Sequence, residues 1–387
     1  MNIRRSVLGA ARHIAHVSVI TLLTGFIVGC SFFGSNSVKP KPAELGANIP
    51  VIGVQQAWSI ALGASTGVPL VPHVWGTTVV AAASNGVVAA IDARTGSSLW
   101  RVDLGAPLAA GVGSDGRLTA VVSGANEIIV LEAGKELWRQ RLAAQVYTPP
   151  LVAGGRVFVL AADRTVAAFD AMSGRRLWSQ ARVGDPLVLR QPGVLMAVDD
   201  TLIAGMSGRL VGLNPDNGVS RWEAPIASPR GTNDIERLVE LTAPVSRIGD
   251  SVCVRAFQAA VGCVNAVRGT VLWTQKSNGS DGVDGDAGTV FGAQSDGVVT
   301  AWRRSDGTQL WLSERLLHRK LSAPLVLGRS VVIGDETGLV HFLSRADGAP
   351  LNRLVTDGSG IAAPPMLAAD VLVVITRKGN IYGFRPD

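Results

Sequence analysis

A short segment ending in tryptophan recurs along the chain, and this repeat constrains the fold more than any other feature. The clearest copy is TVAAFDAMSGRRLW, residues 165–178, which alternates along an expected strand, turns at Ser173-Gly174 and ends in a second strand. The matching positions are separated by 42, 38, 40, 44, 51, 38 and 41 residues. They are Trp58, Trp100, Trp138, Trp178, Trp222, Trp273, Trp311 and, in a degenerate copy, Asn352. A period of this length is typical of a β-propeller, in which each repeat forms one blade of four strands.

One complete repeat, residues 148–183, shows how a blade is built. Its four predicted strands are TPPLVAG, RVFVLAA, TVAAFDA and RRLWSQARV, with a turn at Asp163-Arg164 between the second and third. Most other copies carry glycine in their turns, which supplies the positive φ of tight hairpins. The runs of Val, Leu and Ala suit strands that are covered on both faces by neighbouring blades.

The two ends of the repeat array are incomplete, and each supplies what the other lacks. Trp58 belongs to a fourth strand with no first three before it, whereas residues 362–386 supply three strands with no fourth after them. We therefore predict an all-β, eight-bladed propeller over residues 51–387, closed by pairing the N-terminal strand with the C-terminal three. In this fold the repeated Trp side chains are expected to be structural, and Asp92 and Asp170 to cap turns.

The first 50 residues are expected to lie outside the propeller. Residues 1–29 have three arginines before an apolar run from Val17 to Val28, as in a secretory signal peptide. The signal ends Ile27-Val28-Gly29-Cys30, which resembles a bacterial lipobox and predicts a lipid on Cys30. Ser31 at the next position favours the periplasmic face of the outer membrane by resemblance to lipoprotein sorting rules. Residues 30–50 are then expected to be the lipidated cysteine and a flexible tether.

Charge and cysteine content exclude some classes of function. The formal charge of +6 falls to +3 when the three signal-peptide arginines are removed, which is too weak and scattered for nucleic-acid binding. Cys253 and Cys263 are predicted on neighbouring strands of one hairpin. With a two-residue turn at Gln258-Ala259, Cys253 faces Val264 and the two sulfurs point to opposite faces, which favours free buried thiols. A slipped register would instead bring the sulfurs together, in a compartment that permits disulfides.

We expect no catalytic, cofactor or metal site. The match to a nucleophile-elbow motif at residues 63–67 is not followed by a helix, and an inter-blade link explains it better. The three histidines of the mature chain have no metal-ligand spacing, and an EF-hand starting at Asp281 would need a glutamate where Gly292 stands. Asp281, Asp284 and Asp286 are therefore expected to be solvated turn acids.

Two links between blades break the repeat, and irregular links often carry function. One, residues 183–191, contains Leu187, Leu189 and Arg190; the other, residues 227–241, mixes acidic and apolar residues. Both should lie on the same face and flank one blade. Apolar anchors with a charged rim suit a protein contact. The alternative, supported equally by composition, is that the leucines point inward and Arg190 is solvated.

The blade pattern G-x-V-x-A-x-D-x-x-x-G-x-x-x-W resembles the quinoprotein-type propellers. With the lipobox, the tether and the segment SERLLHRKLSAPLVLGRSVVIGDETGLVHFL at 313–343, the chain resembles the BamB family of outer-membrane lipoproteins. The resemblance implies docking to POTRA domains of BamA, with other members of the β-barrel assembly (BAM) complex and unfolded outer-membrane protein clients as further partners. It assigns the contact to Leu187, Leu189, Arg190, Ile235, Glu236, Arg237 and Glu240. Thr242 stands where the family has a second acid.

The sequence thus predicts a non-enzymatic scaffold that assists folding and insertion of outer-membrane proteins. The alternative function is a periplasmic dehydrogenase dependent on pyrroloquinoline quinone, on the same propeller fold. Such an enzyme would need a calcium site and cofactor-clamping residues, and often has two adjacent cysteines, which this sequence lacks. A third interpretation is a propeller that binds peptidoglycan or another lipoprotein.

Overall fold

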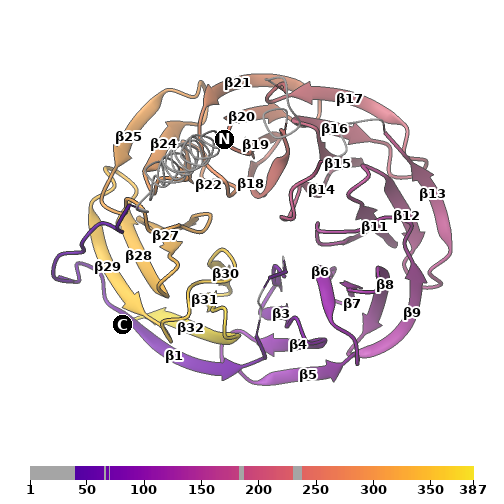
Figure 1. The fold of residues 1–387 in the computed structure, drawn as a ribbon, viewed down its shortest axis with the longest axis horizontal. Coiled ribbons are helices and arrows are strands. Elements are labelled where there is room, and N and C mark those ends of the chain that lie inside the picture. Colours follow the sequence, from indigo (N-terminus) through magenta and orange to yellow (C-terminus); the bar gives the residue numbers. More distant parts are fainter. Residues whose placement is uncertain (1–39, 65–66, 69, 183–186, 230–237) are drawn as a thin grey trace, which may run out of the picture. The chain divides into compact units, whose positions relative to one another are not determined.

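The computed structural model describes residues 40–64, 67–68, 70–182, 187–229 and 238–387. Within the compact unit Pro42–Asp387, the described residues form eight four-stranded antiparallel sheets. The sheets are arranged as blades around a ring (Figure 1). Among the described residues, no helix is long and apolar enough to cross a membrane. The predicted all-β architecture of eight blades is confirmed.

Each blade is ordered from an inner first strand to an outer fourth strand, and the blades are numbered along the chain. Blade 1 contains β2 (His73–Trp75), β3 (Thr78–Ala82), β4 (Val87–Asp92) and β5 (Ser98–Asp103), and blade 2 contains β6 (Leu108–Ser114), β7 (Leu118–Ser123), β8 (Glu127–Glu132) and β9 (Lys135–Arg141). Blade 3 contains β10 (Leu151–Ala153), β11 (Arg156–Leu160), β12 (Val166–Asp170) and β13 (Arg176–Gln180), and blade 4 contains β14 (Leu195–Val198), β15 (Thr201–Met206), β16 (Arg209–Leu213) and β17 (Ser220–Pro225).

The second half of the ring continues in the same order. Blade 5 contains β18 (Leu241–Ile248), β19 (Ser251–Ala256), β20 (Ala260–Asn265) and β21 (Thr270–Lys276), and blade 6 contains β22 (Asp284–Gly285), β23 (Thr289–Ala293), β24 (Val299–Arg303) and β25 (Gln309–Ser313). Blade 7 contains β26 (Leu325–Leu327), β27 (Ser330–Gly334), β28 (Leu339–Ser344) and β29 (Pro350–Val355), and blade 8 contains β30 (Met366–Ala368), β31 (Val371–Ile375), β32 (Asn380–Pro386) and β1 (Val54–Ala61).

The ring closes in blade 8, where the two ends of the propeller meet. β1 pairs antiparallel with β32, and Trp58 lies opposite Gly383. The indigo first strand and the yellow last strands lie side by side in Figure 1. Closure by the N-terminal strand, as predicted from the two incomplete ends, is confirmed, and it leaves no unpaired edge between the first and last blades.

The core lies between blades, because the middle strands are covered on both faces. All six residues of β7 are buried, and all five residues of β31 are buried. Apolar clusters join neighbouring blades; one packs Val79 of blade 1 against Val373 of blade 8. Val, Leu, Ile and Ala dominate because each sheet must fill the space on both sides.

Each repeated tryptophan joins its blade to the next one. A register shift precedes Trp178 in the pairing of β12 with β13, and β-bulges of this kind increase local twist. The Nε1 atom of Trp58 donates to the carbonyl oxygen of Ala93, 2.8 Å away, in the third-to-fourth turn of blade 1. A Cβ atom on Gly96 in that turn would lie 2.7 Å from the Trp58 ring. The repeat therefore needs glycine in the turn because the previous blade's indole occupies the space of a side chain.

The degenerate copy at Asn352 is explained by the ring closure. In blade 8 the third strand runs to the end of the chain, and β1 enters from the other end in place of a turn. The side-chain nitrogen Nδ2 of Asn352 donates to the carbonyl oxygen of Ile52, 2.9 Å away, just before β1. An amide thus makes at the seam the hydrogen bond that the tryptophan makes to the turn.

The antiparallel strand order places two kinds of connection on opposite faces of the ring. Second-to-third turns and the links between blades share one face, which we call the linker face. The contacts agree, because His318 N in the link after β25 donates to Asp296 O in the second-to-third turn of blade 6, 2.7 Å away. On the opposite face, Asp92 and Asp170 accept backbone hydrogen bonds within their turns, as predicted for capping carboxylates.

The expectation of free thiols is wrong. Cys253 lies directly opposite Cys263, and the two form a disulfide whose residues are fully buried. Ala256 pairs with Ala260, so three residues separate the paired strands instead of the two assumed at Gln258-Ala259. The extra residue moves the register by one position, which turns both cysteines to the same face of the sheet.

Candidate docking site on the linker face

The two irregular links lie on either side of blade 4, as predicted. Leu187, Leu189 and Arg190 belong to the link from β13 to β14, and Glu240 ends the link from β17 to β18. Leu187 is 39% exposed, Arg190 is exposed and Leu189 is half-buried. Ile235, Glu236 and Arg237 lie outside the described residues, as do residues 183–186.

The exposed residues of the two links form what we call the docking surface. Arg164, in the second-to-third turn of blade 3, connects both links beneath it. Its Nη2 atom donates to Glu240 Oε1 at 2.9 Å and to the carbonyl oxygen of Leu187 at 3.5 Å. Its Nε atom donates to Ser207 Oγ at 2.7 Å, in the second-to-third turn of blade 4. The side chains of Arg164 and Glu240 are only 8% and 16% exposed. One guanidinium group therefore joins two turns and two links, and charge-assisted hydrogen bonds of this kind are strong when partly buried.

The local backbone explains how Arg164 comes to this position. The turn places Arg164 in the left-handed region at φ 65°, where glycine is usual, and Arg164 N donates to Ala161 O at 2.9 Å. Asp163 Oδ1 accepts from Thr165 N and holds the other side of the turn. A non-glycine residue in this conformation is uncommon and typical of functional or tightly constrained positions.

Arg190 lies between the docking surface and the centre of the ring. Its guanidinium carbon is 6.0 Å from the centre of the Tyr147 ring, a distance at which a cation is attracted to an aromatic face. The residues that follow it are fixed to blade 5, since Ala243 N donates to Pro192 O at 3.0 Å. Gly193 N donates to Thr148 Oγ1 at 3.1 Å, which ties the same link to blade 3.

Thr242, which follows the second irregular link near the start of β18, faces the interior. It is 2% exposed and pairs directly with Arg255, which is fully buried. In the described part of the chain, Thr242 Oγ1 and the Nε and Nη2 atoms of Arg255 have no hydrogen-bond partner. Burial lowers the pKa of Arg255 to about 10, and the nearby Asp281 carboxylate opposes this shift. A carboxylate at position 242 would therefore face a buried guanidinium and not a solvent-exposed rim.

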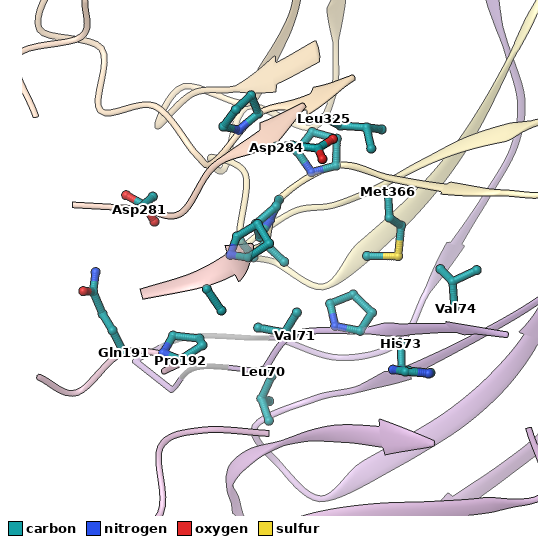
Figure 2. Close-up of a pocket in the computed structure, with 18 of the residues that line it drawn as sticks. Leu70, Val71, His73, Val74, Gln191, Pro192, Asp281, Asp284, Leu325 and Met366 are labelled. Carbon is teal, nitrogen blue, oxygen red and sulfur yellow. The ribbon is translucent and has the colours of Figure 1, made fainter. Parts of the chain in front are cut away.

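A cavity of about 930 Å³ occupies the centre of the ring, where the residues leading into the first strands converge. Figure 2 shows Gln191 and Pro192 on one side of it and Asp281 and Asp284 on another. Arg190 also lines this cavity, so the link from β13 to β14 borders both the docking surface and the central cavity. Much of the remaining wall is proline or aliphatic, because proline precedes the first strand in several blades.

The interpretation of Asp281 and Asp284 as solvated turn acids is wrong. Both line the central cavity, and burial raises the pKa of each carboxyl group; hydrogen bonds from Ser280 to Asp281 and from Val326 N to Asp284 limit the shift. Asp286 does act in a turn, where it accepts from Gly288 N and Thr289 N. Among the described residues, no group of three or more His, Cys, Asp or Glu side chains is placed to hold a metal ion.

Arg164 and Tyr147 are the residues of this site that the sequence interpretation missed. A signal for Arg164 was present, since this turn reads Asp163-Arg164 where several other blades have Ser-Gly, Asp-Gly or Thr-Gly. No comparable pattern marks Tyr147, because its role depends on contact with a link more than 40 residues away.

Comparison with known proteins identifies the family of this chain. The family model described as outer membrane protein assembly factor BamB matches residues 84–313. The outer membrane protein assembly factor BamB of Burkholderia pseudomallei is 40% identical over 374 residues, covering 96% of this chain and 98% of the relative. The protein of the same name from Bordetella pertussis is 34% identical over 369 residues, covering 94% and 96%.

Solved structures agree with the propeller fold. The crystal structure of BamB from Moraxella catarrhalis matches with a TM-score of 0.78 and 22% identity, covering 86% of this chain and 99% of that chain. Quinohemoprotein alcohol dehydrogenase from Comamonas testosteroni matches with a TM-score of 0.65 and 17% identity, covering 86% and 76%. At these identities the likeness concerns the fold alone. With a family model over more than half of its length and full-length relatives at 34% and 40% identity, the chain belongs to the BamB family of outer membrane protein assembly factors, which are not enzymes.

Proposed function

We propose that this chain is a lipid-anchored scaffold of the BAM complex that docks to a POTRA domain of BamA through the links beside blade 4. Leu187 and Leu189 supply apolar contacts, and Arg190 binds a carboxylate of the partner. Residues Ile235, Glu236 and Arg237 contribute from the second link. The lipid on Cys30 holds the propeller at the periplasmic face of the outer membrane, where unfolded outer-membrane proteins are its clients.

One observation carries the docking site. Arg164 fixes both links to the propeller through Ser207, Glu240 and the backbone of Leu187, while Leu187 and Arg190 remain exposed. A rigid base beneath exposed apolar and cationic groups reduces the conformational entropy lost on binding. Arginine is one of the residue types enriched among interface hot spots.

The sharpest test is Arg190→Glu in the full-length lipidated protein. We expect this variant to keep its circular dichroism spectrum and urea midpoint, since Arg190 is exposed, but to recover much less BamA from detergent extracts. Arg268→Glu is the matched control, because Arg268 is exposed in a turn on the opposite face of neighbouring blade 5. Equal BamA recovery with both variants would remove this surface as the docking site.

A separate measurement addresses the clients and the anchor. Photo-crosslinking from position 189 in native membranes should capture BamA, and capture of an unfolded outer-membrane protein instead would assign the links to client binding.

Mass spectrometry of the mature N-terminus should find a diacylated Cys30. An unmodified cysteine would contradict the lipid anchor without affecting the docking site.

A further inference from the structure

Residues 43–52, which we call the N-terminal strap, lie along the outer side of blade 7. Val51 N donates to Leu351 O at 2.7 Å, and the side chain of Asn48 donates to Arg353 O at 3.0 Å. In return, Arg353 Nη2 donates to the carbonyl oxygen of Gly46 at 3.1 Å. The strap therefore follows the outer edge of β29, and Figure 1 shows this indigo segment beside that strand.

The strap ends on the linker face. Ala43 N donates to the carbonyl oxygen of Leu317 at 2.8 Å, in the link from β25 to β26. The carbonyl oxygen of Ala43 accepts two hydrogen bonds from Arg319, from Nε at 3.1 Å and Nη2 at 2.7 Å. Leu45 packs against the apolar cluster between blades 6 and 7. The backbone N–H and C=O groups of Ala43 are thus both hydrogen-bonded to the link from β25 to β26 on the linker face.

Arg319 is itself fixed by a buried carboxylate. Its Nη1 atom lies 3.1 Å from Asp335 Oδ2, which also contacts His341 Nε2 at 2.9 Å. Burial would raise the pKa of Asp335, but hydrogen bonds from His341, Thr337 and Leu339 N outweigh burial and hold the pKa well below its ordinary value. The carboxylate therefore stays charged and orients a guanidinium whose side chain is only 11% exposed.

Asn352 explains why the strap lies on blade 7. Its side chain donates to Ile52 O and accepts from Asn48 Nδ2 at 3.2 Å, so it binds the strap at two points. The seven blades with tryptophan at this position use it to contact the next blade. Loss of the indole at the seam thus accompanies a gain of polar contacts to the N-terminal segment.

We propose that the strap moors the N-terminal segment to the linker face, so that a lipid surface attached through Cys30 meets the same face as the docking site. The inference rests on the proposed lipidation of Cys30. Ala43 is the thirteenth residue after Cys30. At ~3.3–3.6 Å per residue, an extended chain from Cys30 to Ala43 spans at most ~45 Å, whereas one from Cys30 to Val54 at the start of β1 spans up to ~80 Å. The strap therefore roughly halves the greatest distance between Cys30 and its attachment to the propeller, and it places that attachment on the linker face.

Hydrogen exchange on the purified full-length protein tests the mooring without any membrane. The amides of Ala43 and Val51 should exchange slowly, because each donates to a carbonyl oxygen of the propeller. The double substitution Arg319→Ala and Asn48→Ala should release strap peptides to fast exchange while the blades stay protected. Arg315→Ala, an exposed arginine of the same link, is the control and should leave exchange unchanged. Fast exchange of the strap in the parent protein would overturn the proposal.

Vesicles test the orientation. A fluorophore is attached through Asp163→Cys on the linker face or Met172→Cys on the opposite face, both exposed positions of blade 3. The lipidated proteins are bound to vesicles of phosphatidylethanolamine and phosphatidylglycerol that contain a nitroxide headgroup quencher. We expect strong quenching at position 163 and little at position 172, with the difference lost in the double variant that releases the strap.

The outcomes separate this inference from the proposed function. Equal quenching at both positions would overturn the orientation even if BamA is recovered normally. Failure of the full-length protein to bind vesicles would overturn both the lipid anchor and the membrane role of the strap. Loss of BamA recovery in Arg190→Glu with unchanged quenching would support the docking site and the mooring as separate features.

Discussion

Arg164 and Glu240 form an ion pair of 2.9 Å across 76 residues of sequence. The pair joins the second-to-third turn of blade 3 to the link that enters blade 5, and blade 4 lies between them. The position of the docking surface therefore depends on a contact between blades that are not neighbours in the chain. A substitution beneath the surface should affect partner binding without touching the partner.

Arg164→Ala should destabilise the propeller and weaken BamA recovery together. The substitution removes hydrogen bonds to Ser207 and to the Glu240 carboxylate, and we expect a loss of about 1–3 kcal/mol in the free energy of unfolding. Urea denaturation and co-purification measure the two effects. Arg175→Ala, an exposed residue of the same blade, is the control. Full BamA recovery by a destabilised Arg164→Ala protein would show that the junction does not position the links.

Thr242→Asp should stabilise the protein and leave BamA recovery unchanged. The new carboxylate would face Arg255, whose Nε and Nη2 atoms have no partner among the described residues, and the expected gain is about 1–3 kcal/mol. Thr242→Val, which has a similar shape but no charge, separates pairing from packing. An increase in BamA recovery with no gain in stability would instead place position 242 in the partner contact.

Loss of the Cys253–Cys263 disulfide should lower stability without unfolding the protein. The bridge closes a loop with a sequence separation of 10, for which the chain-entropy model gives about 2–3 kcal/mol. The double substitution Cys253→Ala and Cys263→Ala should shift the urea midpoint accordingly. Dithiothreitol without denaturant should leave the parent unchanged, because both residues are fully buried. Rapid reduction of the folded protein would contradict that burial.

Asp357→Asn should make stability less sensitive to acid. Burial alone would raise the pKa of Asp357, but hydrogen bonds from Ser359, Thr376 and Asn380 outweigh it and lower the pKa from 3.8 to about 2. Because the folded-state pKa is depressed, the stabilisation is present above pH 3.8 and is lost as pH falls towards 2. Urea midpoints measured across this window should fall less in the variant than in the parent. The control, Asp370→Asn, alters an exposed carboxyl group of blade 8 and should follow the parent.

The repeat made the fold predictable, since a period read from Trp58 to Asn352 also located the blades, their order and the closure. It worked because each tryptophan makes the same contact to a glycine-containing turn of the next blade, so the contact recurs with the repeat. The disulfide was missed because one extra residue in the hairpin loop reverses which face a cysteine occupies. Arg164 was missed because its contacts to Ser207, Leu187 and Glu240 are distant in sequence. The missing glycine marks its turn as unusual but does not identify those partners.

The environment of the two aspartates in the central cavity also could not be predicted from the local sequence. Asp281 and Asp284 were expected to be solvated turn acids because the segment lacks the glutamate that an EF-hand needs. In the ring both carboxyl groups line the central cavity at the start of blade 6, and partial burial there raises their pKa. Burial of a polar residue is a property of the assembled ring, whereas turn chemistry is a property of the local sequence.

The pairing of β1 with β32 also dictates when the protein can finish folding. β1 is the first strand of the propeller to be synthesised, and its hydrogen-bond partner is the last. If the chain is exported N-terminus first, the early blades can stack while translocation continues, but blade 8 must wait for the final residues to emerge. Until then both ends of the growing array present unpaired strands to whatever chaperones the compartment provides.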